Sequence, residues 1–307
     1  MSILSNPFFY APAAGAAGIN TKGIFFGGDS GDPIGVSNLV SDSGVVSSDV
    51  GAVGTARSQS GGSTYGNDKA IFAFGTTGSL TNISNLVSNS GVIASDTTGV
   101  GTSRNFMGMG CGYGEDKGIF AFGQGAGTTR FNISNLVSNS GVVATDSGGV
   151  GTARGGTASV TYDTDKAIYA FGQTAGSYTS VSNLVSNSGV VASDTAGVGT
   201  ARYVLGSAGY GDDKGICVFG YNTSTENQQM SNLISNSGVV ATDTSGVGTA
   251  RRYVPGCTYG SDKGIVAYGY GSGYDSMSNL ISNSGVVATD TTGVGTGRYG
   301  PGATAYA

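Results

Sequence analysis

Charged side chains recur at fixed spacing in this chain, and they are the first candidates for chemistry. An arginine follows an aspartate by eight residues six times, and an aspartate directly precedes a lysine five times. Paired carboxylates and cations could serve acid–base catalysis, but one active site uses one set of groups and here all copies are alike. We therefore interpret the arginine set as structural anchors and the lysine set as turn residues. The pairs are Asp49/Arg57, Asp96/Arg104, Asp146/Arg154, Asp194/Arg202, Asp243/Arg251 and Asp290/Arg298, and Asp68-Lys69, Asp116-Lys117, Asp165-Lys166, Asp213-Lys214 and Asp262-Lys263.

Other catalytic chemistry finds little support in the sequence. The chain has no histidine, so Ser-His-Asp and Cys-His nucleophiles and imidazole metal ligands are impossible. A glycosidase needs only two carboxylates, but the acids outside the repeated pairs show no pairing, and no run has the spacing of a calcium loop. We expect a protein that is not an enzyme and that uses no cofactor and no metal. The unpaired acids are Asp29, Asp32, Asp42, Glu115, Asp163, Asp212, Glu226 and Asp275.

The charge and hydrophobicity of the chain limit the kinds of partner that it can bind. The formal net charge is −5, and of 14 lysines and arginines only Arg130 and Arg252 lie outside the repeated positions. No basic stripe remains for nucleic acid, so we expect none to bind. There is no apolar run of 18 residues and no basic segment at the start, so we expect neither membrane insertion nor a signal peptide. Cys111 and Cys257 occupy equivalent positions in different units, too far apart for a disulfide. We therefore predict that these two cysteines and Cys217 are buried free thiols.

The elements that hold these residues come from an internal repeat. Lysines 22, 69, 117, 166, 214 and 263 mark a period of 47 to 49 residues. Each unit contains four short strand candidates, which in the fifth unit are 203–210, 216–219, 230–235 and 239–242. The second is apolar at consecutive positions, as expected for a strand buried on both faces. Six such units predict an all-β fold, a six-bladed β-propeller of four-stranded antiparallel blades.

The two ends of the chain suggest how this array closes. Tyr306 follows Arg298 by eight residues, the spacing seen inside most units, whereas the N-terminal segment lacks this register. We therefore predict that residues 299–306 form the inner strand of the blade that contains Ile24–Phe26. In this scheme residues 1–18 are an N-terminal arm and residues 19–307 form the propeller, closed by its C-terminal strand.

The layout of the units resembles the kelch repeat. Each unit has an apolar strand that ends in glycine and a later stretch of small residues that ends in arginine; Gly27-Gly28 reproduces the kelch diglycine, although the kelch tryptophan is absent. The resemblance implies a propeller, and the copper-radical oxidases of that family need histidine ligands that this chain lacks. The wording of the repeats is also similar to repeat proteins of marine tailed phages. That similarity implies a virion component, assembled in the host cytoplasm.

Variation among the six copies is concentrated in two places, the loop between the second and third strands and the stretch after each arginine. In an up-and-down blade both lie on one face, which we call the variable face, while the Asp-Lys and Asn-Ser-Gly turns lie on the other. Aromatic and charged residues gather at the variable positions, and such residues often make recognition surfaces. The predicted binding residues are Arg130, Phe131, Tyr178, Tyr221, Glu226, Arg252, Tyr253, Tyr274 and Asp275.

Two functional hypotheses follow. The first is a non-enzymatic phage structural and interaction protein, a decoration, fibre or tail-associated propeller that binds another virion protein or a host-surface glycan or protein. The second is a propeller lectin with repeated carbohydrate sites, although the repeated tyrosines that could serve as platforms are better explained as core residues. Homo-oligomerisation is left open. The repeated tyrosines are Tyr65, Tyr113, Tyr162, Tyr210 and Tyr259.

Overall fold

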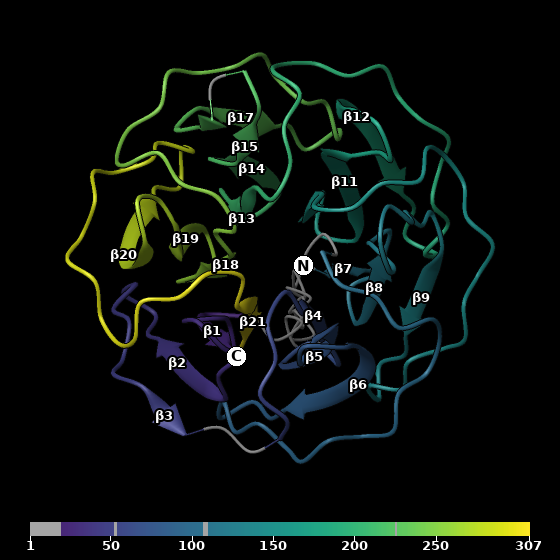
Figure 1. Cartoon of the computed structure of the whole chain (residues 1–307), viewed down its shortest axis with the longest axis horizontal. Coiled ribbons are helices and arrows are strands. Elements are labelled where there is room, and N and C mark those ends of the chain that lie inside the picture. The colour runs from purple at the N-terminus through teal and green to yellow at the C-terminus, as the bar shows by residue number, and fades with distance from the viewer. Residues whose placement is uncertain (1–19, 52–53, 107–109, 225) are drawn as a thin grey trace, which may run out of the picture.

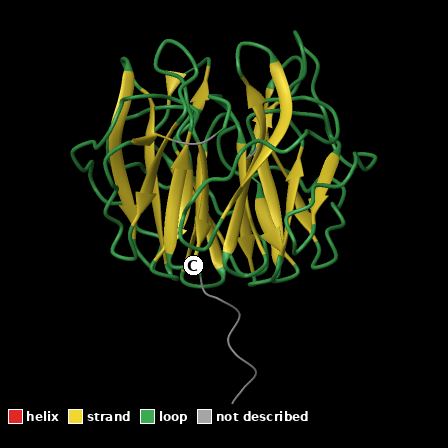
Figure 2. Ribbon diagram, turned by 90° about the horizontal axis from the view of Figure 1, so that it is seen from below, coloured by secondary structure: helices red, strands yellow, loops and turns green. Residues whose placement is uncertain are grey.

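The computed structural model describes residues 20–307 except 52–53, 107–109 and 225, and these residues form an all-β structure. Antiparallel sheets of three or four strands repeat around a central axis, an arrangement compatible with a propeller-like repeat fold (Figure 1). The first strand of each sheet lies near the axis and the third lies toward the rim, and the strands run between two faces made of loops (Figure 2). No helix in this part of the chain is long and apolar enough to cross a membrane.

The sheets follow the sequence repeat. The strands, in sheet order, are β21 (Gly302–Tyr306), β1 (Lys22–Phe26), β2 (Val36–Val40) and β3 (Val50–Gly51); β4 (Gly61–Tyr65), β5 (Lys69–Thr76) and β6 (Leu80–Val87); β7 (Cys111–Tyr113), β8 (Lys117–Ala121) and β9 (Ser134–Val137); β10 (Ala158–Tyr162), β11 (Lys166–Gln173) and β12 (Tyr178–Val185); β13 (Gly206–Tyr210), β14 (Lys214–Val218) and β17 (Ser231–Ile234); and β18 (Gly256–Tyr259), β19 (Lys263–Tyr270) and β20 (Tyr274–Ile281). A separate two-stranded ribbon pairs β15 (Tyr221–Asn222) with β16 (Glu226–Asn227).

The second strand of each unit lies inside the sheet stack. In β5, residues 70–74 are fully buried, and the same holds for the apolar positions of β1 and β19. Aromatic rings from neighbouring sheets meet between them, with Phe26 and Phe72 at 5.2 Å and Phe74 and Phe120 at 5.7 Å. This burial on both faces explains why the strand is apolar at consecutive positions, and the aromatic residues supply most of the contact area between sheets.

The expected fourth strand is much reduced. In the fifth unit it consists of the isolated bridges between Ile234 and Val240 and between Ser231 and Thr244. A buried side chain takes part in its place, because the Asn232 amide donates to the carbonyl of Ala241 at 2.9 Å. Only the first unit has a fourth strand in its sheet, the two-residue β3, among the residues described. The rim is therefore held by side-chain bonds as well as by backbone pairing.

Residues from the two ends of the chain share one sheet. β21 pairs antiparallel with β1, with Tyr306 opposite Lys22 and Gly302 opposite Phe26. The strand is shorter than the predicted segment 299–306, but Tyr299 bridges to Asp29 just beyond it. The predicted arm, residues 1–18, lies outside the described residues.

The repeated tyrosines are core residues, and this explains the Asn-Ser-Gly turns. Tyr162 is 3% exposed, and a Cβ placed on Gly238, in the next unit, would lie 2.9 Å from its ring. Gly238 has φ +73°, a conformation that side chains disfavour, so both shape and backbone call for glycine. Tyr306 packs against Gly91 in the same way, across the two ends of the chain. The three cysteines are buried and free, as predicted.

Candidate functional site

The six repeated arginines are fully buried anchors between neighbouring units. Arg202 lies 4.4 Å from the ring centre of Phe171 in the fourth unit. It donates to the fifth unit through Nε to the carbonyl of Phe219 at 2.8 Å and through Nη2 to Oδ1 of Asn232 at 2.6 Å. Burial lowers the pKa of Arg202 to about 10, so the guanidinium stays charged at neutral pH. Almost every donor is occupied, as a structural role requires.

The carboxylate partner of each arginine comes from the next unit. Arg202 lies 3.7 Å from Asp243, whereas Asp194, eight residues before Arg202 in the sequence, faces Arg154 at 3.9 Å. Arg298 faces Asp49 at 3.7 Å, so the same contact joins the last and first units. Each aspartate also accepts from a threonine of the preceding unit, for example from the Thr200 hydroxyl at 2.7 Å. The repeated aspartates and arginines therefore link each unit to the next.

Arg57 departs from this pattern for a physical reason. All five other repeated arginines stack on an aromatic ring at the end of the second strand, but Gly27 occupies that position in the first unit. Arg57 lies instead 5.0 Å from the ring of Phe26. Its Nε and the Oδ1 of Asn85 have no hydrogen-bond partner among the described residues. Without an aromatic ring at the position of Gly27, Arg57 is thus left with incomplete hydrogen bonding.

Two variable positions of every unit are paired with each other on the variable face. The residue directly after the repeated arginine forms an isolated bridge with a residue at or just past the end of the second strand. In the second to fourth units these pairs are small or polar, whereas in the fifth, sixth and first units they contain four tyrosines, an arginine and an aspartate. The pairs are Ser58/Thr76, Asn105/Gln124, Gly155/Gln173, Tyr203/Tyr221, Arg252/Tyr270 and Tyr299/Asp29.

The aromatic pairs join into one surface, which we call the aromatic arc. Tyr178, from the fourth unit, stacks on Tyr203 at 5.2 Å and meets Tyr221 edge-on at 6.4 Å. At the other end Tyr274 stacks on Tyr299 at 5.9 Å. Tyr274 is 44% exposed, so its ring is open to solvent. The arc comprises Tyr178, Tyr203, Tyr221, Arg252, Tyr253, Tyr270, Tyr274 and Tyr299.

Arg252 lies in the middle of the arc. Its guanidinium carbon is 4.7 Å from the ring centre of Tyr221 and 5.1 Å from that of Tyr270. These contacts are favourable, because a planar cation is attracted to an aromatic face. Among the described residues its side chain donates no hydrogen bond and forms no ion pair, unlike the buried arginines. The arc therefore holds a cation whose N–H groups are left for another molecule.

The arc reaches the central axis at Tyr253, beside a ring of strained backbone. Gln59, Phe106, Val204 and Tyr253 have φ between 47° and 55°, and Gly156 and Gly300 occupy the two equivalent positions. Backbone bonds join these residues from unit to unit: Tyr253 N–H donates to Val204 at 2.9 Å, and Gly300 N–H donates to Tyr253 at 3.1 Å. We call these six residues the collar. Left-handed backbone at non-glycine residues is costly and persists where the surroundings impose it.

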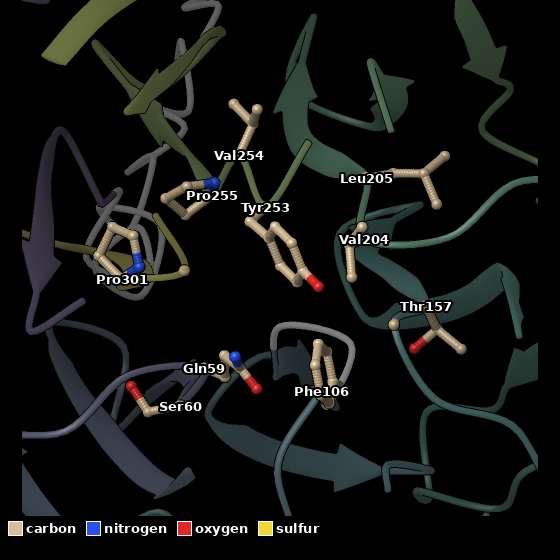
Figure 3. Close-up of a pocket in the computed structure, with 12 residues that line it drawn as sticks. Gln59, Ser60, Phe106, Thr157, Val204, Leu205, Tyr253, Val254, Pro255 and Pro301 are labelled. Atoms are coloured by element: carbon tan, nitrogen blue, oxygen red, sulfur yellow. The ribbon is translucent and has the colours of Figure 1, made fainter. Parts of the chain in front are cut away.

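A small pocket lies at the collar. Tyr253 and Phe106 approach each other from opposite sides, with ring centres 5.7 Å apart, and apolar residues such as Leu205 and Pro301 also line the pocket (Figure 3). The hydroxyls of Ser60 and Thr157 are buried here without a partner among the described residues. The volume is about 50 Å³. Small-molecule sites are usually about 300–1,000 Å³, so this pocket is too small to be the main binding site.

The structure brings five of the nine predicted binding residues into the arc: Tyr178, Tyr221, Arg252, Tyr253 and Tyr274. It also adds Tyr203, Tyr270 and Tyr299, which sequence reasoning missed. Position could have identified Tyr203 and Tyr299, because each directly follows a repeated arginine, as the predicted Arg252 does.

The other four predicted residues stand apart from the rings. Arg130 donates to the side chain of Gln173 at 2.9 Å, next to the end of the arc. Burial lowers the pKa of Arg130, and the hydroxyl of Tyr203 opposes that shift. Phe131 is half-buried over Gly125. Glu226 is exposed on β16, and Asp275 is half-buried on β20, where burial raises its pKa and nearby Arg251 opposes that rise.

The opposite face, which carries the Asp-Lys and Asn-Ser-Gly turns and which we call the turn face, offers no comparable site among the described residues. Its lysines, apart from Lys22, pair with aspartates of the same turn, as Lys214 does with Asp213. The second oxygen of Asp213 accepts from Asn236 of the Asn-Ser-Gly turn at 2.9 Å. The described residues contain no group of three Cys, Asp or Glu side chains placed to hold a metal ion. Comparison with protein-family models and with curated proteins finds no match.

Proposed function

We propose that this chain is a non-enzymatic interaction protein that binds its partner through the aromatic arc. The observation that carries the proposal is the arc itself, a run of tyrosines around an arginine whose donors are unused within the described structure. Tyrosine and arginine are the residue types that dominate binding energy at protein surfaces. The repeated Asp–Arg pairs are occupied with structural bonds, so we assign them no catalytic role.

We further propose that the fold is a closed six-bladed β-propeller. The pairing of β21 with β1 supports closure, as do the Arg298–Asp49 and Tyr306–Gly91 contacts, which repeat across the chain ends the contacts found between consecutive units. Deleting residues 299–307 would remove an inner strand and should unfold the whole ring. A truncated protein with unchanged thermal melting would contradict closure. Deleting residues 2–15 is the matched control, and it should spare folding.

The biological setting we propose is a phage virion, in which the chain is a decoration, fibre or tail-associated protein that binds another virion protein or the host surface. The virion setting rests on the resemblance of the repeats noted in the sequence, and the aromatic arc supports a binding role. Purified particles should contain the chain. Particles that carry Tyr203→Gly with Tyr221→Gln should attach to host cells less well, or lose the partner protein, while still folding normally. Absence of the chain from purified particles would contradict the virion role.

Repeated carbohydrate sites are a weaker candidate. The tyrosines repeated in every unit are between 3% and 6% exposed and pack under the turns of the next unit, so they are closed to a ligand. A binding stoichiometry near one ligand per chain supports the arc, whereas about six per chain would favour repeated sites.

A further inference from the structure

Arg130 and Arg252 are the two cations outside the repeated positions, and both lie at the aromatic arc. Every other lysine and arginine belongs to the repeat, where the arginines are buried between units and the lysines, apart from Lys22, pair with turn aspartates. Arg130 adjoins Gln173 and Tyr203 at one end, and Arg252 lies between Tyr221 and Tyr270 in the middle. In a chain of net charge −5 this is the place where an anion is best received.

Arg252 is organised for a planar anion. The rings of Tyr221 and Tyr270 hold its guanidinium at 4.7 Å and 5.1 Å, which restricts the side chain before any ligand arrives. A guanidinium matches a carboxylate with two parallel N–H···O bonds, and less is lost on binding when the fork is already fixed. Its N–H groups donate to no described residue, so the ligand would be their partner.

Backbone pairing argues against an extended peptide. Tyr203 and Tyr221 exchange two backbone bonds of 3.0 Å, and Arg252 and Tyr270 exchange bonds of 3.1 Å and 2.8 Å. A peptide that adds to a sheet needs unpaired N–H and C=O groups, and at these pairs they are used. What the arc offers is ring faces, phenol hydroxyls and one guanidinium. Those groups suit a ligand with apolar ring faces of its own and a fixed acid group.

We propose, resting on the proposed binding function, that the arc binds an acidic saccharide, with its carboxylate on Arg252 and its sugar rings against the tyrosines. The C–H faces of a sugar ring can lie on a tyrosine ring, and the phenol hydroxyls can exchange hydrogen bonds with sugar hydroxyls. The exposed Glu226 and the net negative charge disfavour a densely charged polyanion. We therefore expect one carboxylate at a time to be recognised.

The test uses two matched pairs of probes, 3′-sialyllactose against lactose and a galacturonate trimer against its methyl ester, titrated into the full chain by calorimetry or NMR. At least one acidic probe should bind about 10- to 100-fold more tightly than its neutral match, the range for loss of a charge-assisted hydrogen bond. The preference should weaken as salt rises. Arg252→Gln should abolish the preference for the acidic member.

The chain supplies matched variants for this experiment. Tyr221→Gln places in the fifth unit the residue that the fourth unit has at Gln173, and it should weaken binding of acidic and neutral probes alike. Lys214→Gln removes a cation from the opposite face and should change nothing. Circular dichroism and thermal melting of each variant confirm that it is folded before binding is compared.

Several outcomes would overturn the inference. These are equal binding of acid and ester, binding that Arg252→Gln leaves unchanged, failure of every acidic saccharide to bind, and tighter Arg252-dependent binding of an acidic peptide such as oligoglutamate. Failure here while particles still contain the chain and need the arc would leave the virion role intact. Binding of an acidic saccharide by a chain that no particle contains would overturn the virion role alone.

Discussion

The two halves of the variable face are built alike and carry different side chains. Across the second, third and fourth units the paired positions hold Ser58/Thr76, Asn105/Gln124 and Gly155/Gln173, whereas across the fifth, sixth and first they hold five arc residues and Asp29. The backbone bridges are the same in both halves, and so are the buried arginines beneath them apart from Arg57. The comparison shows that the repeated backbone fixes where the paired residues lie. The side chains at these two positions of each unit then determine whether the surface is polar or aromatic.

Acid pH should produce the largest loss of stability, and it should destabilise both halves. Burial would raise the pKa of the six anchor aspartates, but hydrogen bonds from threonine and asparagine and the nearby arginine lower it overall, as at Asp146 and Asp243. A carboxylate with a lowered folded pKa contributes stability above its unfolded pKa of about 3.9, and this is lost as pH falls through the folded pKa.

Urea denaturation should therefore give a constant midpoint from about pH 7 to 5 and a falling one below about pH 4. Asp146→Asn removes one of the six anchor aspartates, so it should make this dependence shallower, and it serves as the control. A midpoint that rises below pH 4 would contradict the assignment.

Removing one complete anchor comes next. Arg104→Ala and Arg202→Ala, one in each half, should each lower the free energy of unfolding by about 3 kcal/mol, because each leaves buried acceptors unpaired and an aromatic face uncovered. Chemical denaturation measures both. A large difference between the two variants would show that the halves differ in their framework as well as in their surface.

Exchanging the paired surface residues should change the affinity for the partner and leave the stability of the fold unchanged. Tyr203→Gly with Tyr221→Gln gives the fifth unit the paired residues of the fourth, and it should weaken partner binding about 10-fold or more while changing stability by less than about 1 kcal/mol. Partner association and thermal melting are measured on the same preparation. The reciprocal exchange, Gly155→Tyr with Gln173→Tyr, asks whether the polar half can be made to bind.

The smallest effect is expected at the incomplete anchor. Arg57→Ala should cost about 1–2 kcal/mol, less than Arg202→Ala, because Nε of Arg57 and Oδ1 of Asn85 already lack partners among the described residues. Equal losses at Arg57 and Arg202 would mean that the hydrogen bonds contribute little compared with burial of the side chain.

Much of the fold follows from the repeat, because its cues are local. Alternation of apolar strands and glycine turns predicts the sheets, and the spacing from Arg298 to Tyr306 predicts the pairing of the last strand with the first. Which aspartate faces each arginine depends on how units dock, so the constant spacing of eight residues was a misleading guide to partners. The reduced fourth strand was missed because Asn232 replaces backbone pairing with a side-chain bond.

The binding surface was only partly predictable for a similar reason. Loop aromatics such as Tyr178 and Tyr274 stand out as departures between copies. Tyr270 lies at a variable loop position but was not selected as a binding residue, and Tyr299 was assigned to the closing strand. Their role appears only when the bridges bring both variable positions of a unit together, which is a tertiary property.

The collar has a consequence for how such a protein could diversify. Its links run through backbone atoms, so the chain already tolerates Gln59, Phe106, Val204 and Tyr253 there, with glycine at two further sites. Left-handed backbone sets a cost for each side chain, but no particular side chain is needed to join one unit to the next. The four non-glycine sites could therefore be randomised together as a library around the axis, whereas a Cβ on Gly156 would lie 3.0 Å from the backbone nitrogen of Val204.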